Sequence, residues 1–135
     1  MKLIFADSSG WLGLVNTTDS VHQKATQIYD SKYAEGYNFI THQGILLEVG
    51  NSLSGLRLRQ SAVGLKNKLE KSQRVEIRQL DNELYKAGWK LYAERTDKNW
   101  GIVDCISFVL MERLNIREAF TADRHFEQAG YIKLL

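Results

Sequence analysis

The sequence contains no proline and only one cysteine among its 135 residues. Without proline, the loops must turn on glycine, asparagine, aspartate and serine. A single cysteine, Cys105, excludes an intramolecular disulfide and any cysteine-rich zinc site, which fits a reducing compartment. No stretch approaches the about 20 apolar residues of a membrane-spanning helix, and the opening residues lack the pattern of a signal peptide. We therefore expect a cytoplasmic protein that does not associate with membranes.

A strong excess of one charge is also missing. Eighteen Lys and Arg residues against sixteen Asp and Glu residues give a net charge of +2. So small a net charge does not itself indicate a nucleic-acid partner; only the distribution of charges does. One segment is lopsided, because six basic residues between positions 57 and 74 accompany a single acid, Glu70. These six either contact an RNA backbone or form a solvated helical face: Arg57, Arg59, Lys66, Lys68, Lys71 and Arg74.

What the sequence does contain is an alternation of short apolar runs with amphipathic segments. Strands are predicted at 3–6, 38–40, 75–77, 119–121 and 131–134. Helices are predicted at about 8–15, 19–35, 41–56, 61–72, 81–92 and 102–114. Apolar strands separated by helices are typical of a parallel sheet covered on both faces. We therefore predict an α/β fold, a three-layer α/β/α sandwich with a mainly parallel central sheet, in one domain spanning 1–135.

Polar residues mark the predicted helix ends. Ser8 or Ser9 is expected to cap the first helix, Thr41 the third and Asp81 the fifth. Gly36 is expected to end the second helix, because glycine readily adopts the left-handed conformation found just after a helix.

Four acids stand out by their positions. Asp7 and Asp123 follow predicted strands, whereas Glu48 and Asp104 interrupt apolar runs. Each alone has an ordinary interpretation, such as a turn residue, a solvated helix residue or a charge favoured at a helix start. Ligands of parallel sheets bind beyond the carboxyl ends of the strands, so the four acids can converge on one crevice. Such a cluster repels itself unless cations neutralise it, and oxygen ligands favour Mg²⁺ or Mn²⁺.

The segments that carry these acids resemble the four motifs of the PIN domain, in the same order and along the whole chain. They are FADSSGWL at 5–12, Thr41 with LEVGN at 47–51, DKNWGIVDCISF at 97–108, and FTADRHF with AGY between 120 and 131. One departure is Gly101, where the third motif often has a hydroxyl residue.

The resemblance implies a divalent-metal-dependent endoribonuclease that hydrolyses RNA phosphodiester bonds. Carried over residue by residue, Asp7, Glu48, Asp104 and Asp123 would be catalytic and would hold Mg²⁺ or Mn²⁺. Many short members are VapC-like toxins of bacterial toxin–antitoxin pairs. An RNA substrate, a cognate antitoxin protein and a homodimer are therefore expected. The alternatives are a PIN nuclease that processes RNA without being a toxin, and a catalytically silent PIN-fold module that binds RNA or protein.

Several neighbouring residues have two readings. Asn51 lies one helical turn after Glu48 and either supports the site or is a surface amide. Thr121 and Ser8 either hydrogen-bond to site carboxylates or, for Ser8, cap a helix. His125 either contacts phosphate or, as we expect for a single histidine beside an arginine, lies at the surface.

The antitoxin has two candidate docking faces. One is the apolar face near Ile28 and Tyr29, and the other is the helix face that bears Leu53 and Leu56. Either would receive an amphipathic helix if it stays partly exposed in the fold.

Overall fold

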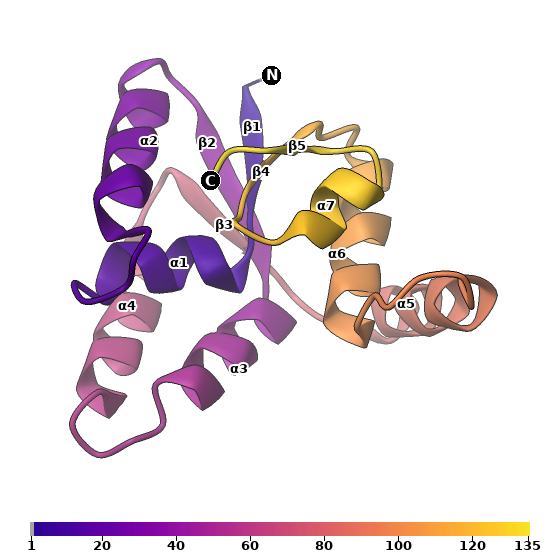
Figure 1. Ribbon diagram of the computed structural model, residues 1–135, viewed down its shortest axis with the longest axis horizontal. Helices are drawn as coiled ribbons and strands as arrows, with labels where there is room; N and C mark the ends of the chain where they lie inside the picture. Colours follow the sequence, from indigo (N-terminus) through magenta and orange to yellow (C-terminus); the bar gives the residue numbers. More distant parts are fainter. Residues whose placement is uncertain (1) are drawn as a thin grey trace.

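The computed structural model describes residues 2–135 as seven helices and five strands (Figure 1). The strands are β1 (Leu3–Ala6), β2 (Asn38–His42), β3 (Val75–Arg78), β4 (Glu118–Phe120) and β5 (Ile132–Lys133). The helices are α1 (Ser8–Val15), α2 (His22–Ala34), α3 (Gln43–Ser52), α4 (Arg59–Lys71), α5 (Asn82–Glu94), α6 (Ile102–Arg113) and α7 (Arg124–Gln128). Within residues 2–135, no helix combines the length and apolar character needed to cross a bilayer.

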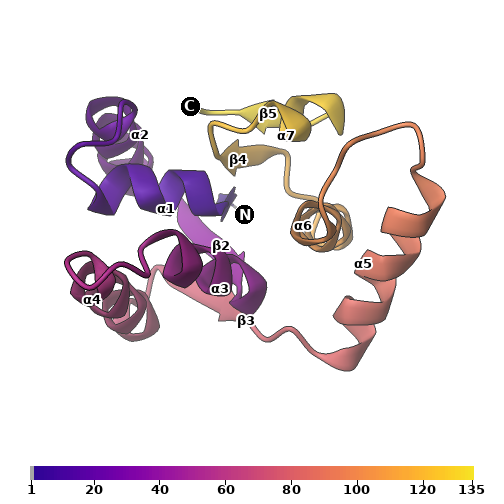
Figure 2. The same cartoon turned by 60° about the horizontal axis from the view of Figure 1, so that its bottom comes forward.

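The strands form one parallel sheet in the order β3-β2-β1-β4-β5. The chain builds one half of the sheet from β1 to β3 and then crosses back to β4 and β5, so the strand order reverses between β1 and β4. Helices α1, α2 and α4 lie on one side of the sheet, and α5, α6 and α7 lie on the other (Figure 2). Right-handed crossovers produce this division, because the two halves of the sheet grow in opposite directions. The predicted fold class is confirmed.

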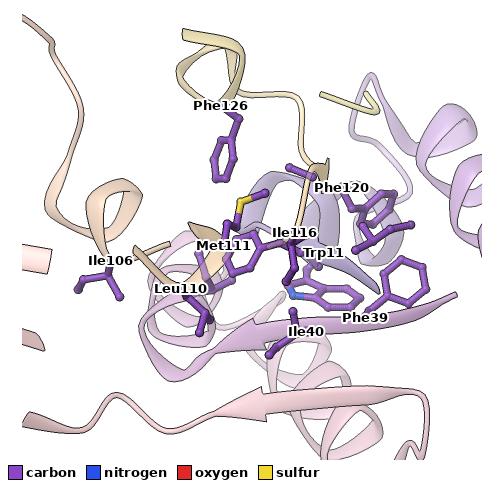
Figure 3. Packing of buried hydrophobic residues seen from close by; sticks show 14 of the residues in the cluster. Trp11, Phe39, Ile40, Ile106, Leu110, Met111, Ile116, Phe120 and Phe126 are labelled. Atoms are coloured by element: carbon purple, nitrogen blue, oxygen red, sulfur yellow. The ribbon is translucent and has the colours of Figure 1, made fainter. Parts of the chain in front are cut away.

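Aromatic side chains from three parts of the chain pack on one face of the sheet. Trp11 of α1 is fully buried, and its ring lies 6.4 Å from Phe39 of β2 and 6.1 Å from Phe120 of β4. Leu110 and Met111 of α6 belong to the same buried cluster (Figure 3). Strand β1 is a continuous apolar run because both of its faces are covered, whereas the edge strand β3 alternates apolar and charged residues. The core therefore holds β1 and β4, and the residues that follow these two strands, in fixed positions.

Helix α1 approaches β4 very closely at Gly10. A Cβ atom at this position would collide with the carbonyl oxygen and the ring of Phe120. Only glycine allows this approach, which places the start of α1 directly beside the carboxyl ends of β1 and β4. Gly10 thus fixes the position of the residues around Asp7.

Two of the predicted helix caps are wrong. The N-cap of α1 is Asp7, and the helix already begins at Ser8, so neither Ser8 nor Ser9 caps it. Thr41 lies in β2, where its hydroxyl donates to a backbone carbonyl of β1 at 2.9 Å. The N-cap of α3 is His42, whose ring nitrogen accepts from the amide two residues further on. Strand pairing extends β2 by two residues and moves the cap accordingly.

One predicted helix is too long. Helix α3 ends at Ser52, and Leu56 lies in the following loop with its side chain 90% exposed. The apolar spacing that suggested a helix through Leu56 continued by chance into a loop that contains Gly55. The helix ends predicted at Asp81 and Gly36 are confirmed: the Asp81 carboxylate accepts from an amide of α5 at 2.8 Å, and Gly36 has a φ of +89° after α2. Helix α2 itself begins at His22, three residues later than predicted.

Candidate active site

The four acids singled out in the sequence meet at the carboxyl edge of the sheet, where the strand order reverses. Asp7 follows β1, Asp123 follows β4, Glu48 lies on α3 and Asp104 lies in the first turn of α6. Their charges act on one another. After burial, which is the largest cause, the charges of Asp104 and Asp123 raise the pKa of Asp7, and all three of these aspartates raise the pKa of Glu48. The structure therefore places all four acids in one region at this edge of the sheet, where an oxygen of Asp104 and an oxygen of Asp123 lie within 4.8 Å of each other.

Thr121 connects Asp7, which follows β1, with Asp123, which follows β4. Its hydroxyl donates to Oδ2 of Asp7 at 2.8 Å and accepts from the backbone amide of Asp123 at 3.0 Å. Thr121 is fully buried and Asp7 is 4% exposed. The parallel pairing of β1 with β4 sets the two residues side by side. One threonine thereby orients Asp7 and fixes the backbone that carries Asp123.

The two serines after Asp7 serve different acids. Oγ of Ser9 lies 3.0 Å from the hydroxyl of Thr121 and 3.3 Å from Oδ2 of Asp7. The Ser8 side chain lowers the pKa of Glu48 and partly offsets burial and the neighbouring charges, which raise it. Sequence reasoning missed the contact of Ser9, although its position two residues after the acid of the first motif was the available signal.

Among residues 2–135, no lysine or arginine forms a salt bridge with any of the four site carboxylates, and His125 is the basic side chain that contacts them. Burial raises the pKa of Asp7 to about 6, against the opposing hydrogen bond from Thr121. Burial, and then the charge of Asp7, raise the pKa of Glu48 to about 7. Burial also raises the pKa of Asp104. Carboxylates in this state favour a hard divalent cation, which supplies the missing charge through oxygen ligands. The donor set therefore fits Mg²⁺ or Mn²⁺.

His125 is not the surface residue that we expected from the sequence. Its side chain is 23% exposed, and Nδ1 lies 3.0 Å from Oδ2 of Asp104 and 3.4 Å from Oδ1 of Asp123. The backbone amide of His125 also donates to Oδ1 of Asp123 at 2.9 Å, which caps α7. The signal in the sequence was that His125 lies two positions after Asp123. At this spacing the histidine ring can turn back toward the carboxylate of Asp123, the N-cap of α7.

Gly101 alters how α6 begins. It is the N-cap of α6 and offers no side-chain hydrogen bond, whereas its own amide donates to Oδ2 of Asp104 at 3.1 Å. Half of a capping box is therefore present, and it orients Asp104 without the hydroxyl that the family motif often has.

The remaining predicted residues lie outside this cluster. Asn51 is exposed, and its side chain makes no hydrogen bond to any part of the chain that the structure describes. The basic segment runs along α4 from the carboxyl edge of the sheet toward the opposite edge (Figure 1). Arg57 and Arg59 lie just before and at the start of α4. At the far end, the Arg74 guanidinium donates to the carbonyls of Tyr33 and Tyr37 at 2.8 and 2.6 Å.

Comparison with known proteins identifies the family. Residues 4–131 match the PIN domain. The chain belongs to the PIN domain family. The resemblance inferred from the four motifs is thus confirmed, and the acids that meet at the strand-order reversal are the ones carried by the PIN motifs of this chain.

Two relatives of this PIN domain come from Mycobacterium tuberculosis, strains CDC 1551 / Oshkosh and ATCC 25618 / H37Rv. Each is described as the 23S rRNA-specific endonuclease VapC20, and each is 25% identical over 132 residues, which cover 98% of this chain and 98% of the relative. The crystal structure of Mycobacterium tuberculosis VapC20, described as a sarcin-ricin loop cleaving toxin, superposes with a TM-score of 0.86. That likeness covers 96% of this chain and 97% of the crystallised chain at 25% identity.

Proposed function

We propose that this PIN domain is a divalent-metal-dependent endoribonuclease that hydrolyses RNA phosphodiester bonds and acts as the toxin of a toxin–antitoxin pair. The observation that carries the proposal is the meeting of four acids at the strand-order reversal of a PIN fold. The relatives named above are an rRNA endonuclease and a toxin, and their similarity extends over nearly the whole of this chain. The single domain would therefore contain the complete nuclease.

The side chains of the site have distinct roles in this proposal. Asp7, Glu48, Asp104 and Asp123 would hold Mg²⁺ or Mn²⁺ beside the scissile phosphate. A divalent cation, when bound, lowers the pKa of a water, orients it for in-line attack and neutralises charge on the phosphate. The chain itself contributes rigid placement, since Thr121 holds Asp7 and the Gly101 amide holds Asp104.

The substrate is RNA with accessible phosphates. The acids lie at the edge of the sheet and are partly buried. A scissile phosphate must therefore protrude from the RNA far enough to reach their carboxylates. Single-stranded and loop RNA can splay its backbone and bases into such a site, whereas a regular duplex cannot. A catalytically silent binding module is disfavoured, because it has no need for four mutually repelling carboxylates. An RNA-processing PIN nuclease that is not a toxin remains the second candidate.

A cleavage assay tests the proposal directly. Purified protein should cut single-stranded or loop RNA with Mg²⁺ or Mn²⁺ and stop when a chelator is added. The Asp104→Asn variant is the matched control, because an amide oxygen can still accept from the Gly101 amide while one ligand charge is lost. Equal cleavage by wild type and variant, in preparations free of other ribonucleases, would refute the assignment.

We further propose that the antitoxin binds in an apolar groove of about 820 Å³ between α1, α2 and α4. Trp11, Tyr29 and Leu65 are among the residues that line it. It includes one of the two faces named from the sequence, the one at Tyr29, and it suits the apolar side of an amphipathic helix. The other face is disfavoured, because Leu56 lies in a loop and not on α3.

A homodimer stays a prediction that sedimentation velocity would test. Helix α5 exposes Tyr85, Trp89 and Tyr92 on one face, and their rings contact one another edge to face. Substitutions intended to separate two copies are best placed there.

A further inference from the structure

His125 lies between two carboxylates that come from different helices. Asp104 belongs to α6, whereas Asp123 is the N-cap of α7, and the ring nitrogen Nδ1 faces an oxygen of each. One donor atom from each of the three residues lies within 4.8 Å of the other two. Among residues 2–135, no other group of three His, Cys, Asp or Glu side chains gathers in this way.

The spacing of these atoms suits a shared ion. Adjacent ligand atoms of an octahedral ion with bonds of about 2.1–2.3 Å are about 3.0–3.3 Å apart. Nδ1 of His125 lies 3.0 Å from Oδ2 of Asp104 and 3.4 Å from Oδ1 of Asp123. Both oxygens are also held by backbone amides, those of Gly101 and of His125 itself. The three groups are thus fixed close to the separations that a common ion requires.

We propose that His125 is a nitrogen ligand of the divalent ion, so that Asp104, Asp123 and His125 form a mixed nitrogen–oxygen site that prefers Mn²⁺ to Mg²⁺. This inference rests on the proposed function, because it concerns the same ion. Carboxylate oxygens alone accept Mg²⁺ readily, whereas an imidazole nitrogen favours transition-metal ions. The histidine therefore shifts the metal preference of the site from Mg²⁺ toward Mn²⁺. The rival arrangement is a histidine that only pairs with the two carboxylates and leaves the ion with oxygen ligands.

Pulsed electron paramagnetic resonance of the Mn²⁺-loaded chain separates these arrangements without any substrate. A bound imidazole nitrogen modulates the Mn²⁺ spin echo, and we expect this modulation in the wild type. It should be absent from the His125→Asn variant, in which a short polar side chain replaces the ring. The matched control is His22→Gln, since the His22 ring contacts the carbonyl of Gly13 on another part of the fold. This control should keep the modulation.

Affinity measurements give a second readout. Removal of His125 should weaken Mn²⁺ binding by at least about tenfold, with a much smaller loss for Mg²⁺, so that the ratio of the two affinities falls toward one. Circular dichroism verifies that the variant is folded.

The outcomes distinguish the two levels of the proposal. Mn²⁺ that binds the wild type without nitrogen modulation, or with an affinity that His125→Asn leaves unchanged, overturns the ligand assignment and leaves the nuclease proposal standing. A wild-type protein that binds neither Mn²⁺ nor Mg²⁺ overturns both.

Discussion

Nε2 of His42 lies 2.9 Å from Oγ of Ser107, and this buried contact joins the N-cap of α3 to α6. The Gly44 amide donates to Nδ1 of the same ring at 3.1 Å, so the proton of the neutral ring is on Nε2. The Ser107 hydroxyl accepts a hydrogen bond from this Nε2–H group and donates to a backbone carbonyl one turn earlier in α6 at 2.9 Å. Because α3 carries Glu48 and α6 carries Asp104, the contact sets the relative position of two helices that supply the site.

Removal of the Ser107 hydroxyl should destabilise the fold. In Ser107→Ala, the buried N–H of His42 loses its acceptor, which typically costs about 1–3 kcal/mol. Urea denaturation at pH 7 measures the loss. Ser52→Ala, at the exposed end of α3, is the control and should change the free energy of unfolding by no more than about 0.5 kcal/mol. Equal stability of the two variants would show that the contact contributes nothing.

His42 should make the protein sensitive to acid. Burial lowers its pKa from 6.5 to about 4, so the unfolded chain takes up a proton at a higher pH than the folded one. The resulting loss of stability begins as the pH falls through about 6.5 and is complete near pH 4, where it amounts to about 3 kcal/mol. The stability advantage of wild type over His42→Gln should shrink by about this amount between pH 7 and pH 4. A constant difference would mean that the ring takes up its proton at the same pKa in the folded and the unfolded chain.

Glu48 should have the opposite dependence on pH when no metal is bound. Its pKa rises from 4.5 to about 7 in the fold, so the charged form is penalised. The penalty is absent below the unfolded pKa, grows between pH 4.5 and pH 7, and is complete above that. With chelator at pH 8, Glu48→Gln should therefore be more stable than wild type, by about 1 kcal/mol once solvent screening is allowed for.

Two measurements check this interpretation of Glu48. Added Mg²⁺ or Mn²⁺ should raise the melting temperature of wild type more than that of Glu48→Gln, because the ion binds the intact acid set preferentially. Glu94→Gln, on an exposed part of α5, should respond to metal as wild type does. A Glu48→Gln protein that is less stable than wild type in chelator at pH 8 would contradict the convergent-acid site.

The basic segment should divide into two functional parts. Arg57 and Arg59 lie at the start of α4, the end of this helix on the carboxyl side of the sheet (Figure 1), whereas Lys66 pairs with Glu70 at 3.0 Å further along α4. Replacing both arginines with Gln in the Asp104→Asn background should weaken RNA binding, and each lost phosphate contact should reduce the salt slope by about 0.7–0.9. Lys66→Gln with Lys71→Gln is the control and should leave the slope unchanged. The opposite pattern would place the RNA along the other end of α4.

Gly64 offers a way to close the proposed antitoxin groove without damaging the enzyme. It lines the groove in the middle of α4, and a Cβ atom added there meets nothing within 4 Å. Gly64→Gln should stabilise α4 by about 0.5–1 kcal/mol, because glycine is a poor helix former, and its side chain should obstruct the partner. We expect normal RNA cleavage but growth arrest that the antitoxin no longer relieves. Gly64→Ala fills little of the groove, so the antitoxin should still relieve the growth arrest caused by this variant. If the antitoxin also relieves the growth arrest caused by Gly64→Gln, it binds elsewhere.

Local features of the chain were predictable. The first strand was predicted at 3–6 and is found there, because a continuous apolar run at this length is a buried strand. Asp81 caps α5 as expected, because an N-cap needs only its own carboxylate and the amides that follow it. The four acids stand out in the sequence because two follow apolar strands and two interrupt apolar runs, and because the PIN motifs that carry them are contiguous segments.

The sequence by itself determined the fold class, the strands and the acids, since each depends on residues that are neighbours along the chain. Only the tertiary structure decided the partners of those acids. His125 reaches Asp104 from 21 positions away, Ser107 reaches His42 from 65, and Thr121 reaches Asp7 from 114. Such contacts form only when the parallel strands set distant segments side by side, and a hydrogen bond requires an alignment within a fraction of an ångström that no local pattern encodes.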